Sequence, residues 1–121
     1  MNDIKLEVYN NGKLIFELLG IKDVIRFSPD AGKVEIIVFK TSTGEDFVKI
    51  NAEKTMLGIF SERAWVEYTY PGFEKGQQSL LQLKINESIV PCDLVNYINN
   101  ETGEEKNIYF EISSFYGTDL M

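Results

Sequence analysis

The chain has 121 residues, of which 44% are hydrophobic and 12% aromatic, and its formal net charge is −7. This apolar content is enough for one hydrophobic core, which excludes intrinsic disorder, and the length predicts a single domain over residues 1–121. The absence of histidine and the lone Cys92 exclude histidine general bases, histidine-ligated metals, thiolate zinc sites and an internal disulfide.

The N-terminal part of the chain predicts a β-hairpin. Residues 4–9 alternate apolar and polar side chains, as a half-buried strand does. Asn11 and Gly12 tolerate the positive φ angles of a tight turn, and residues 13–18 then form the returning strand.

Residues 18–27 fit more than one interpretation. Apolar residues at positions 18, 21 and 25 have helical spacing and favour a short helix, although Gly20 weakens it. Pro29 and Gly32 then predict a turn over residues 28–32.

A second hairpin follows. Residues 34–40 are apolar on most of both faces, which is typical of a strand in the middle of a sheet. Residues 41–45 form a turn, and residues 46–50 return. Residues 53–61 give no clear pattern.

Two further strands are predicted before the last third of the chain. Residues 63–70 are rich in aromatic and β-branched side chains, and Pro71 and Gly72 end this strand. Residues 78–85 form the other strand, whose apolar face carries Leu81, Leu83 and Ile85.

The clearest helix is predicted to begin at Pro91. Proline suits a first helical turn, and Asp93 in the same turn favours the helix dipole. Gly103 ends the helix, and the apolar stripe comprises Val90, Leu94, Val95 and Ile98. Residues 107–114 form a last strand. The fold class expected is therefore α+β, a mostly antiparallel sheet with this firm helix and one possible short helix packed on a face.

Catalysis finds little support in the sequence. The glycines are isolated turn residues, and no phosphate-binding loop is present. Glu101, Glu104 and Glu105 cluster, but their spacing differs from that of a calcium loop and is typical of a solvated turn. We expect a protein that is not an enzyme, with no catalytic residues, cofactor or metal.

The sequence also disfavours nucleic-acid binding, membrane insertion and export. Arg26 and Arg63 are the only arginines, and no basic stripe accompanies the aromatic residues, which disfavours nucleic-acid binding. The longest apolar run, residues 36–39, is far too short for a membrane span. The N-terminus lacks the pattern of a signal peptide, so we expect a cytoplasmic protein.

The charge is unevenly distributed along the chain. Residues 1–60 carry nine acids and eight bases, whereas residues 61–121 carry ten acids and four bases. A surface built from the second half repels nucleic acid and anionic lipid and attracts a basic protein. Acidity that serves only solubility is the alternative interpretation.

The aromatic residues Trp65, Tyr68, Tyr70 and Phe73 form a second candidate feature. On a strand, Tyr68 and Tyr70 share one face and Trp65 lies on the other, so most of these rings belong to a core. The remainder forms an aromatic and acidic patch suited to a protein interface, with a small-ligand pocket as the alternative. The acids beside it are Glu62, Glu67 and Glu74.

The segment Ile89-Val90-Pro91-Cys92-Asp93-Leu94-Val95-Asn96-Tyr97-Ile98-Asn99-Asn100-Glu101-Thr102-Gly103-Glu104-Glu105-Lys106-Asn107-Ile108-Tyr109-Phe110-Glu111 resembles the end of a family of bacterial immunity proteins from polymorphic or contact-dependent toxin systems. In that family a Pro-initiated helix ends in a Thr-Gly turn, and the closing strand carries an aromatic-Glu step, usually Trp-Glu. Here the corresponding pairs are Thr102-Gly103 and Phe110-Glu111. The resemblance implies a cytosolic antidote that blocks a cognate toxin domain by binding it, without turnover.

The leading hypothesis is therefore a toxin-neutralising immunity protein that binds a basic toxin domain, for example a nuclease with a phosphate-binding cleft. Its candidate charge contacts are Glu101, Glu104, Glu105 and Glu111, and its candidate aromatic anchors are Tyr68, Tyr70 and Phe73, beside Glu67 and Glu74. The alternatives are a small adaptor or secretion chaperone, a sheet-enclosed pocket for an apolar ligand, and an enzyme that uses carboxylates alone.

Overall fold

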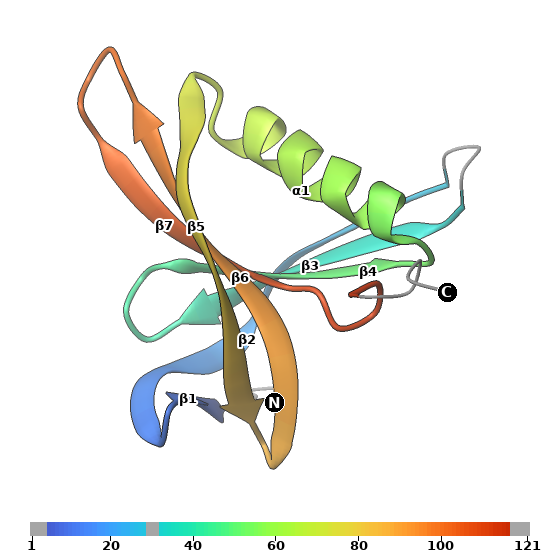
Figure 1. Cartoon of the computed structure of the whole chain (residues 1–121), viewed down its shortest axis with the longest axis vertical. Coiled ribbons are helices and arrows are strands. Elements are labelled where there is room, and N and C mark those ends of the chain that lie inside the picture. The colour runs from blue at the N-terminus through green and yellow to red at the C-terminus, as the bar shows by residue number, and fades with distance from the viewer. Residues whose placement is uncertain (1–4, 29–31, 117–121) are drawn as a thin grey trace.

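The computed structural model describes residues 5–28 and 32–116. In this part of the chain a strongly twisted sheet is crossed by one helix (Figure 1). The elements in chain order are β1 (Leu6–Asn10), β2 (Lys13–Phe27), β3 (Val34–Thr41), β4 (Asp46–Ala52), α1 (Thr55–Thr69), β5 (Phe73–Ile85), β6 (Ser88–Asn99) and β7 (Glu105–Glu111).

The strands are arranged in the order β1-β2-β3-β4-β7-β6-β5, and β1 pairs with β5 to close the sheet into a barrel. All neighbouring strands are antiparallel except β4 and β7, which run parallel. The expected α+β class with a mostly antiparallel sheet is therefore confirmed. No helix of the described residues combines the length and the apolar character that crossing a bilayer requires.

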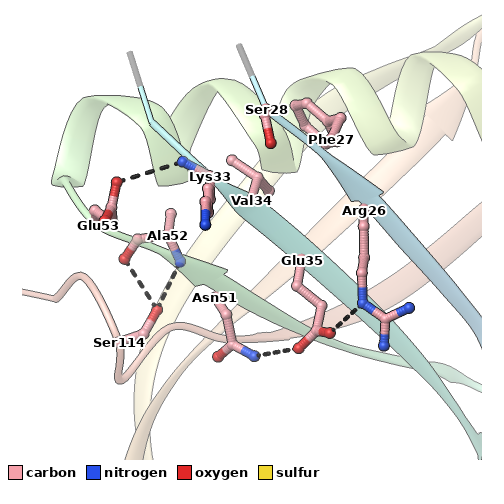
Figure 2. A pocket seen from close by; sticks show the side chains of 10 residues that line it. All are labelled: Arg26, Phe27, Ser28, Lys33, Val34, Glu35, Asn51, Ala52, Glu53 and Ser114. Atoms are coloured by element: carbon pink, nitrogen blue, oxygen red, sulfur yellow. Dashed lines mark hydrogen bonds and ion pairs between the residues drawn. The ribbon is translucent and has the colours of Figure 1, made fainter. Parts of the chain in front are cut away.

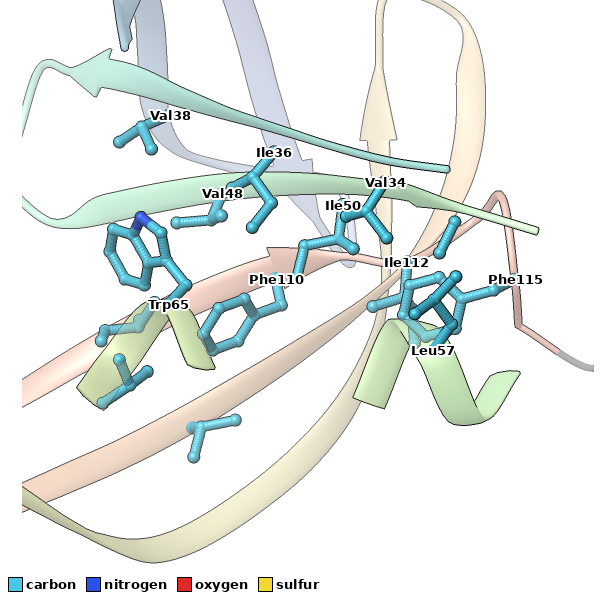
Figure 3. Packing of buried hydrophobic residues seen from close by; sticks show 14 of the residues in the cluster. Val34, Ile36, Val38, Val48, Ile50, Leu57, Trp65, Phe110, Ile112 and Phe115 are labelled. Atoms are coloured by element: carbon cyan, nitrogen blue, oxygen red, sulfur yellow. The ribbon is translucent and has the colours of Figure 1, made fainter. Parts of the chain in front are cut away.

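β3 lies between β2 and β4, as expected for residues 34–40, but it buries only the face of Val34, Ile36 and Val38, whereas Ile37 and Phe39 on the other face are partly exposed. On β4, Val48 and Ile50 face α1, whereas Phe47 points into the barrel. The core under the helix, here called the helix-side core, is shown in Figure 3 and includes Val34, Ile36, Val38, Val48, Ile50, Leu57, Trp65, Val95, Tyr97, Ile108, Phe110, Ile112 and Phe115. The barrel core comprises Val8, Phe16, Leu18, Phe47, Leu83 and Cys92.

Both predicted hairpins are present. Asn11 and Gly12 have φ angles of 54° and 79°, and two consecutive positive angles match the turn that best joins twisted strands. Residues 78–85 lie within β5, where Leu83 is buried as predicted. The last strand is also present, but β7 ends at Glu111 rather than at residue 114.

The predicted strand over residues 63–70 is wrong, because residues 63–69 belong to α1 and Tyr70 directly follows the helix. Buried residues of α1 recur every four positions, at Leu57, Ser61 and Trp65, so one helical face covers the sheet. Trp65 packs edge to face against Phe110, with ring centroids 6.1 Å apart. This burial outweighs the β propensity of the aromatic and β-branched residues, which is a weak preference.

The predicted helix beginning at Pro91 is also wrong, because residues 88–99 form β6. This strand pairs with β5 on one side and with β7 on the other. Cys92 points into the barrel core, while Val95 and Tyr97 point into the helix-side core. Pro91 lies where the β6–β7 ladder ends, so its missing N–H costs little. The helix implied by the family resemblance is therefore not found.

The short helix favoured over residues 18–27 is the third correction. β2 continues to Phe27 and pairs with β3 throughout, with two shifts of register next to Gly20 and Ile21. Such bulges break the alternation of a strand, and the resulting apolar spacing resembled that of a helix. Most of the predicted turn over residues 28–32 lies outside the described residues.

Candidate functional site

The predicted acidic residues gather at one end of the molecule, here called the acidic end. Its carboxylates are Glu67, Glu74, Glu101, Glu104 and Glu105, which are all exposed. The end of α1, the start of β5 and the β6–β7 hairpin lie together there (Figure 1). Glu74 and Glu105 both pair with Ile98, so they lie on the same face of three adjacent strands. Groups from three segments therefore gather at one end of the molecule, where Glu74 and Glu105 point away from α1, because their partner Ile98 alternates with the inward-facing Tyr97.

Few of these carboxylates are neutralised. Glu104 Oε2 lies 3.4 Å from Lys106 Nζ, and Glu105 accepts a hydrogen bond from the amide of Asn96 at 3.2 Å. Glu67, Glu74 and Glu101 form no salt bridge within the described residues. The acidic end consequently keeps free negative groups.

Glu111 was expected to contact a partner, and the structure corrects this. Its side chain is buried, with 5% of the residue exposed. Its carboxylate accepts a hydrogen bond from the backbone N–H of Ser113 at 2.7 Å and lies 3.8 Å from Lys49 Nζ. Glu111 therefore stabilises the end of β7 and is not a surface contact.

The three predicted aromatic anchors have different surroundings. Tyr68 is 80% exposed and lines a hollow on the flank of α1 that faces β2, together with Ile25 and Trp65. Tyr70 and Phe73 pack against the helix-side core, with their rings 5.7 Å apart. The hydroxyl of Tyr70 donates to Asp46, and burial together with this carboxylate raises the pKa of Tyr70. Tyr68 is the anchor candidate, whereas Tyr70 and Phe73 support the acidic end from beneath.

A groove adjoins the acidic end along the flank of α1. The helix packs on β3 and β4, and its free flank faces β5 and β6. Two hollows of about 630 and 290 Å³ form the groove, and they share Ile59, Glu62 and Lys75. Asp93 lies on its floor, because it pairs with Leu80 on one side and with the inward-facing Phe110 on the other.

Two carboxylates face each other in this groove, Glu62 from α1 and Asp93 from β6. Burial raises the pKa of Glu62 to about 8, and the neighbouring Asp93 adds to the effect while Lys75 opposes it. Asp93 is 8% exposed, and burial also raises its pKa, although Gln78 and Lys75 act in the other direction. Neither carboxylate forms a salt bridge within the described part of the chain.

Large apolar side chains surround the same groove. Met56 is 76% exposed, and Ile59, Leu80 and Tyr116 are also exposed around the larger hollow. Our sequence analysis missed this feature. Met56, Ile59 and Arg63 recur at helical spacing, which could have indicated the free side of a helix.

A third hollow, of about 720 Å³, lies at the ends of β2, β3 and β4 (Figure 2). The carboxylate of Glu35, which lines this hollow, already has hydrogen-bond partners. Glu35 accepts hydrogen bonds from Arg26 at 2.8 Å and from Asn51 at 3.1 Å, and these partners hold its pKa below the usual value. Lys33 and Glu53 also line this hollow, and neither side chain forms a salt bridge within the described residues, so the hollow carries one free charge of each sign rather than an acidic surface.

Cys92 lies fully buried in the barrel core, and burial raises the pKa of its thiol. A protonated, inaccessible thiol is a poor nucleophile. Within residues 5–28 and 32–116, no three acidic or thiol side chains are close enough together to hold a metal ion.

Comparison of the chain with protein-family models, with curated proteins and with solved structures found no match.

Proposed function

We propose that the protein is a toxin-neutralising immunity protein, which binds a basic toxin domain in a stoichiometric complex through its acidic end. The observation that carries the proposal is the gathering of five exposed carboxylates from three segments at one end, with one lysine salt bridge among them. A cleft that holds phosphate is basic, so a nuclease toxin suits this surface. Long-range attraction then speeds association, and the exposed Tyr68 adds an aromatic contact.

Co-expression tests the proposal. The chain is produced together with the protein encoded by the adjacent reading frame, and the complex is isolated by an affinity tag. We expect cells to survive the neighbouring protein only when this chain is present, and the complex to contain the two chains in a fixed ratio. Failure to protect the cells, or recovery of this chain alone, contradicts the proposal.

A charge-reversed pair provides the matched control. Glu101→Lys with Glu105→Lys is expected to abolish protection, because the acidic end then repels a basic partner. Glu7→Lys with Glu87→Lys makes the same change in net charge beside a different hollow, formed by β1, β5 and the β5–β6 turn. This second variant is expected to protect like the original protein.

A small adaptor or secretion chaperone is the second candidate, favoured by the exposed apolar side chains around the groove. Such a protein binds an unfolded client segment and leaves a folded basic domain alone, so binding to the folded and the unfolded partner separates the two candidates. A sheet-enclosed ligand pocket is disfavoured, because side chains of the barrel core fill the interior of the barrel.

A further inference from the structure

The groove combines two features that a single kind of ligand satisfies. Its rim is apolar, with Met56, Ile59 and Leu80 exposed on its two sides. Its floor and one wall carry the carboxylates of Asp93 and Glu62, which both line the larger hollow, and Asp93 is 8% exposed. Like charges in such surroundings are costly unless a cation joins them.

The protein itself supplies only partial compensation, through a hydrogen bond from Gln78 to Asp93 and the positive charge of Lys75. The charged or titratable groups that line the two hollows with Glu62 are Asp93 and Tyr97 from β6, Lys75 and Glu74 from β5, Arg63 and Glu67 from α1, and Tyr116 after β7. Lys75 is exposed and forms no salt bridge with either carboxylate within the described residues. The groove therefore retains a capacity for one more positive group.

We propose that this groove binds a segment of the protein partner that carries an arginine between apolar residues. The guanidinium lies between Glu62 and Asp93, and the flanking apolar side chains cover Met56, Ile59 and Leu80. Arginine suits the site better than lysine, because its five N–H donors can serve two carboxylates and it is less strongly hydrated. The inference rests on the proposed function for the class of partner, a basic protein, and adds the place and the residue type.

Peptide titration tests the site without the natural partner. The probes are acetyl-Leu-Arg-Leu-amide and the same peptide with citrulline, which keeps the shape of arginine but has no charge. In ¹⁵N-resolved NMR spectra of the full chain, we expect the arginine peptide to shift resonances of residues 56–63, 75–80 and 93–97. We expect its affinity to exceed that of the citrulline peptide by about tenfold or more, as for hydrogen bonds to a charged group.

Isosteric variants identify the carboxylates. Glu62→Gln and Asp93→Asn are each expected to lower the affinity for the arginine peptide about tenfold. Glu87→Gln, which lies outside the groove, is expected to leave this affinity unchanged. Binding of a cation favours ionised Glu62, so the affinity of the original protein rises with pH through about 8, and this rise disappears in Glu62→Gln. Equal affinity for both peptides, an unchanged affinity in both variants, or no shifts in the groove overturns the inference.

The inference and the proposed function fail in different ways. If Glu62→Gln and Asp93→Asn bind the toxin as the original protein does, while charge reversal at the acidic end abolishes binding, the inference is wrong and the proposed function stands. If no toxin is neutralised but the arginine peptide binds as described, the groove is a peptide site and the immunity role is wrong.

Discussion

Gly58 on α1 lies directly against the ring of Phe115, so closely that a Cβ atom at position 58 would overlap the ring carbons. Phe115 is buried in the helix-side core and also lines the larger hollow of the groove. The glycine thus lets the helix approach the segment after β7, and this approach forms the end of the groove.

Gly58→Ala is expected to lower the free energy of unfolding by about 1–3 kcal/mol, because overpacking forces Phe115 or the helix to move. Alanine stabilises a helix by about 1 kcal/mol relative to glycine. If there were space at position 58, Gly58→Ala would therefore raise the free energy of unfolding. Urea denaturation measures the change. In the double variant with Phe115→Leu the loss is expected to be smaller than the sum of the single losses, and a stabilised Gly58→Ala contradicts the contact.

Trp65 and Tyr68 provide a matched pair of substitutions on α1. Trp65→Ala is expected to lower the free energy of unfolding by about 3–5 kcal/mol, because Trp65 is buried against Tyr70 and Phe110. Tyr68→Ala changes an exposed residue and is expected to stay within about 0.5 kcal/mol. Thermal or urea unfolding measures both. Similar losses at the two positions would argue against this placement of the helix face.

The carboxylates in the groove predict how stability depends on pH. The pKa of Glu62 is about 8 in the folded protein and lies near 4.3 in an unfolded chain, so the folded state holds the proton more tightly. The resulting stabilisation is complete below about pH 4 and is lost as the pH rises towards about 8. Asp93, whose pKa is also raised, acts in the same direction.

Glu62→Gln is the variant that checks this dependence. Relative to the original protein it is expected to gain stability between about pH 5 and 8, by an amount on the order of 1 kcal/mol for a partly buried group. Glu101→Gln, an exposed acid in the β6–β7 hairpin, should leave the pH profile unchanged. Parallel pH profiles for Glu62→Gln and the original protein would contradict the environment described for Glu62.

The buried thiol gives a further prediction. Cys92 is expected to react with a thiol reagent only after unfolding, because it is fully enclosed in the barrel core and its thiol is protonated. A cysteine introduced at the exposed Ser79 should react at once in the same folded protein. Rapid labelling of Cys92 in the folded state would show that β6 is not packed as described.

The sequence predicted those features that depend on local chemistry. The Asn11-Gly12 hairpin followed from the turn residues, and the place of residues 34–40 between two other strands followed from their apolar side chains. Residues 63–69 and 91–99 were assigned to the wrong element, because each contains apolar spacings that fit both a helix and a strand. Pairing of β6 with β5 and β7, and packing of Trp65 on Phe110, decide these cases over long distances in the chain.

The sequence predicted one part of the candidate site, the acidic end, and missed the groove. The excess of acids in residues 61–121 indicated the acidic end, where Glu101, Glu104 and Glu105 are exposed as a surface role requires. The burial of Glu111 depends on Lys49 and Ser113, which no local pattern indicates. The groove requires α1 to lie beside β5, so Glu62 and Asp93 could not be brought together from the sequence.

The most direct test of the account is the rate at which the chain associates with the cognate toxin, measured for two triple variants. Glu101→Gln, Glu104→Gln and Glu105→Gln remove three charges from the acidic end, and Glu7→Gln, Glu17→Gln and Glu87→Gln remove three around the hollow beside β1. We expect the first variant to associate at least about tenfold more slowly at low salt, and the second to match the original protein. Equal rates for the two variants would contradict binding through the acidic end.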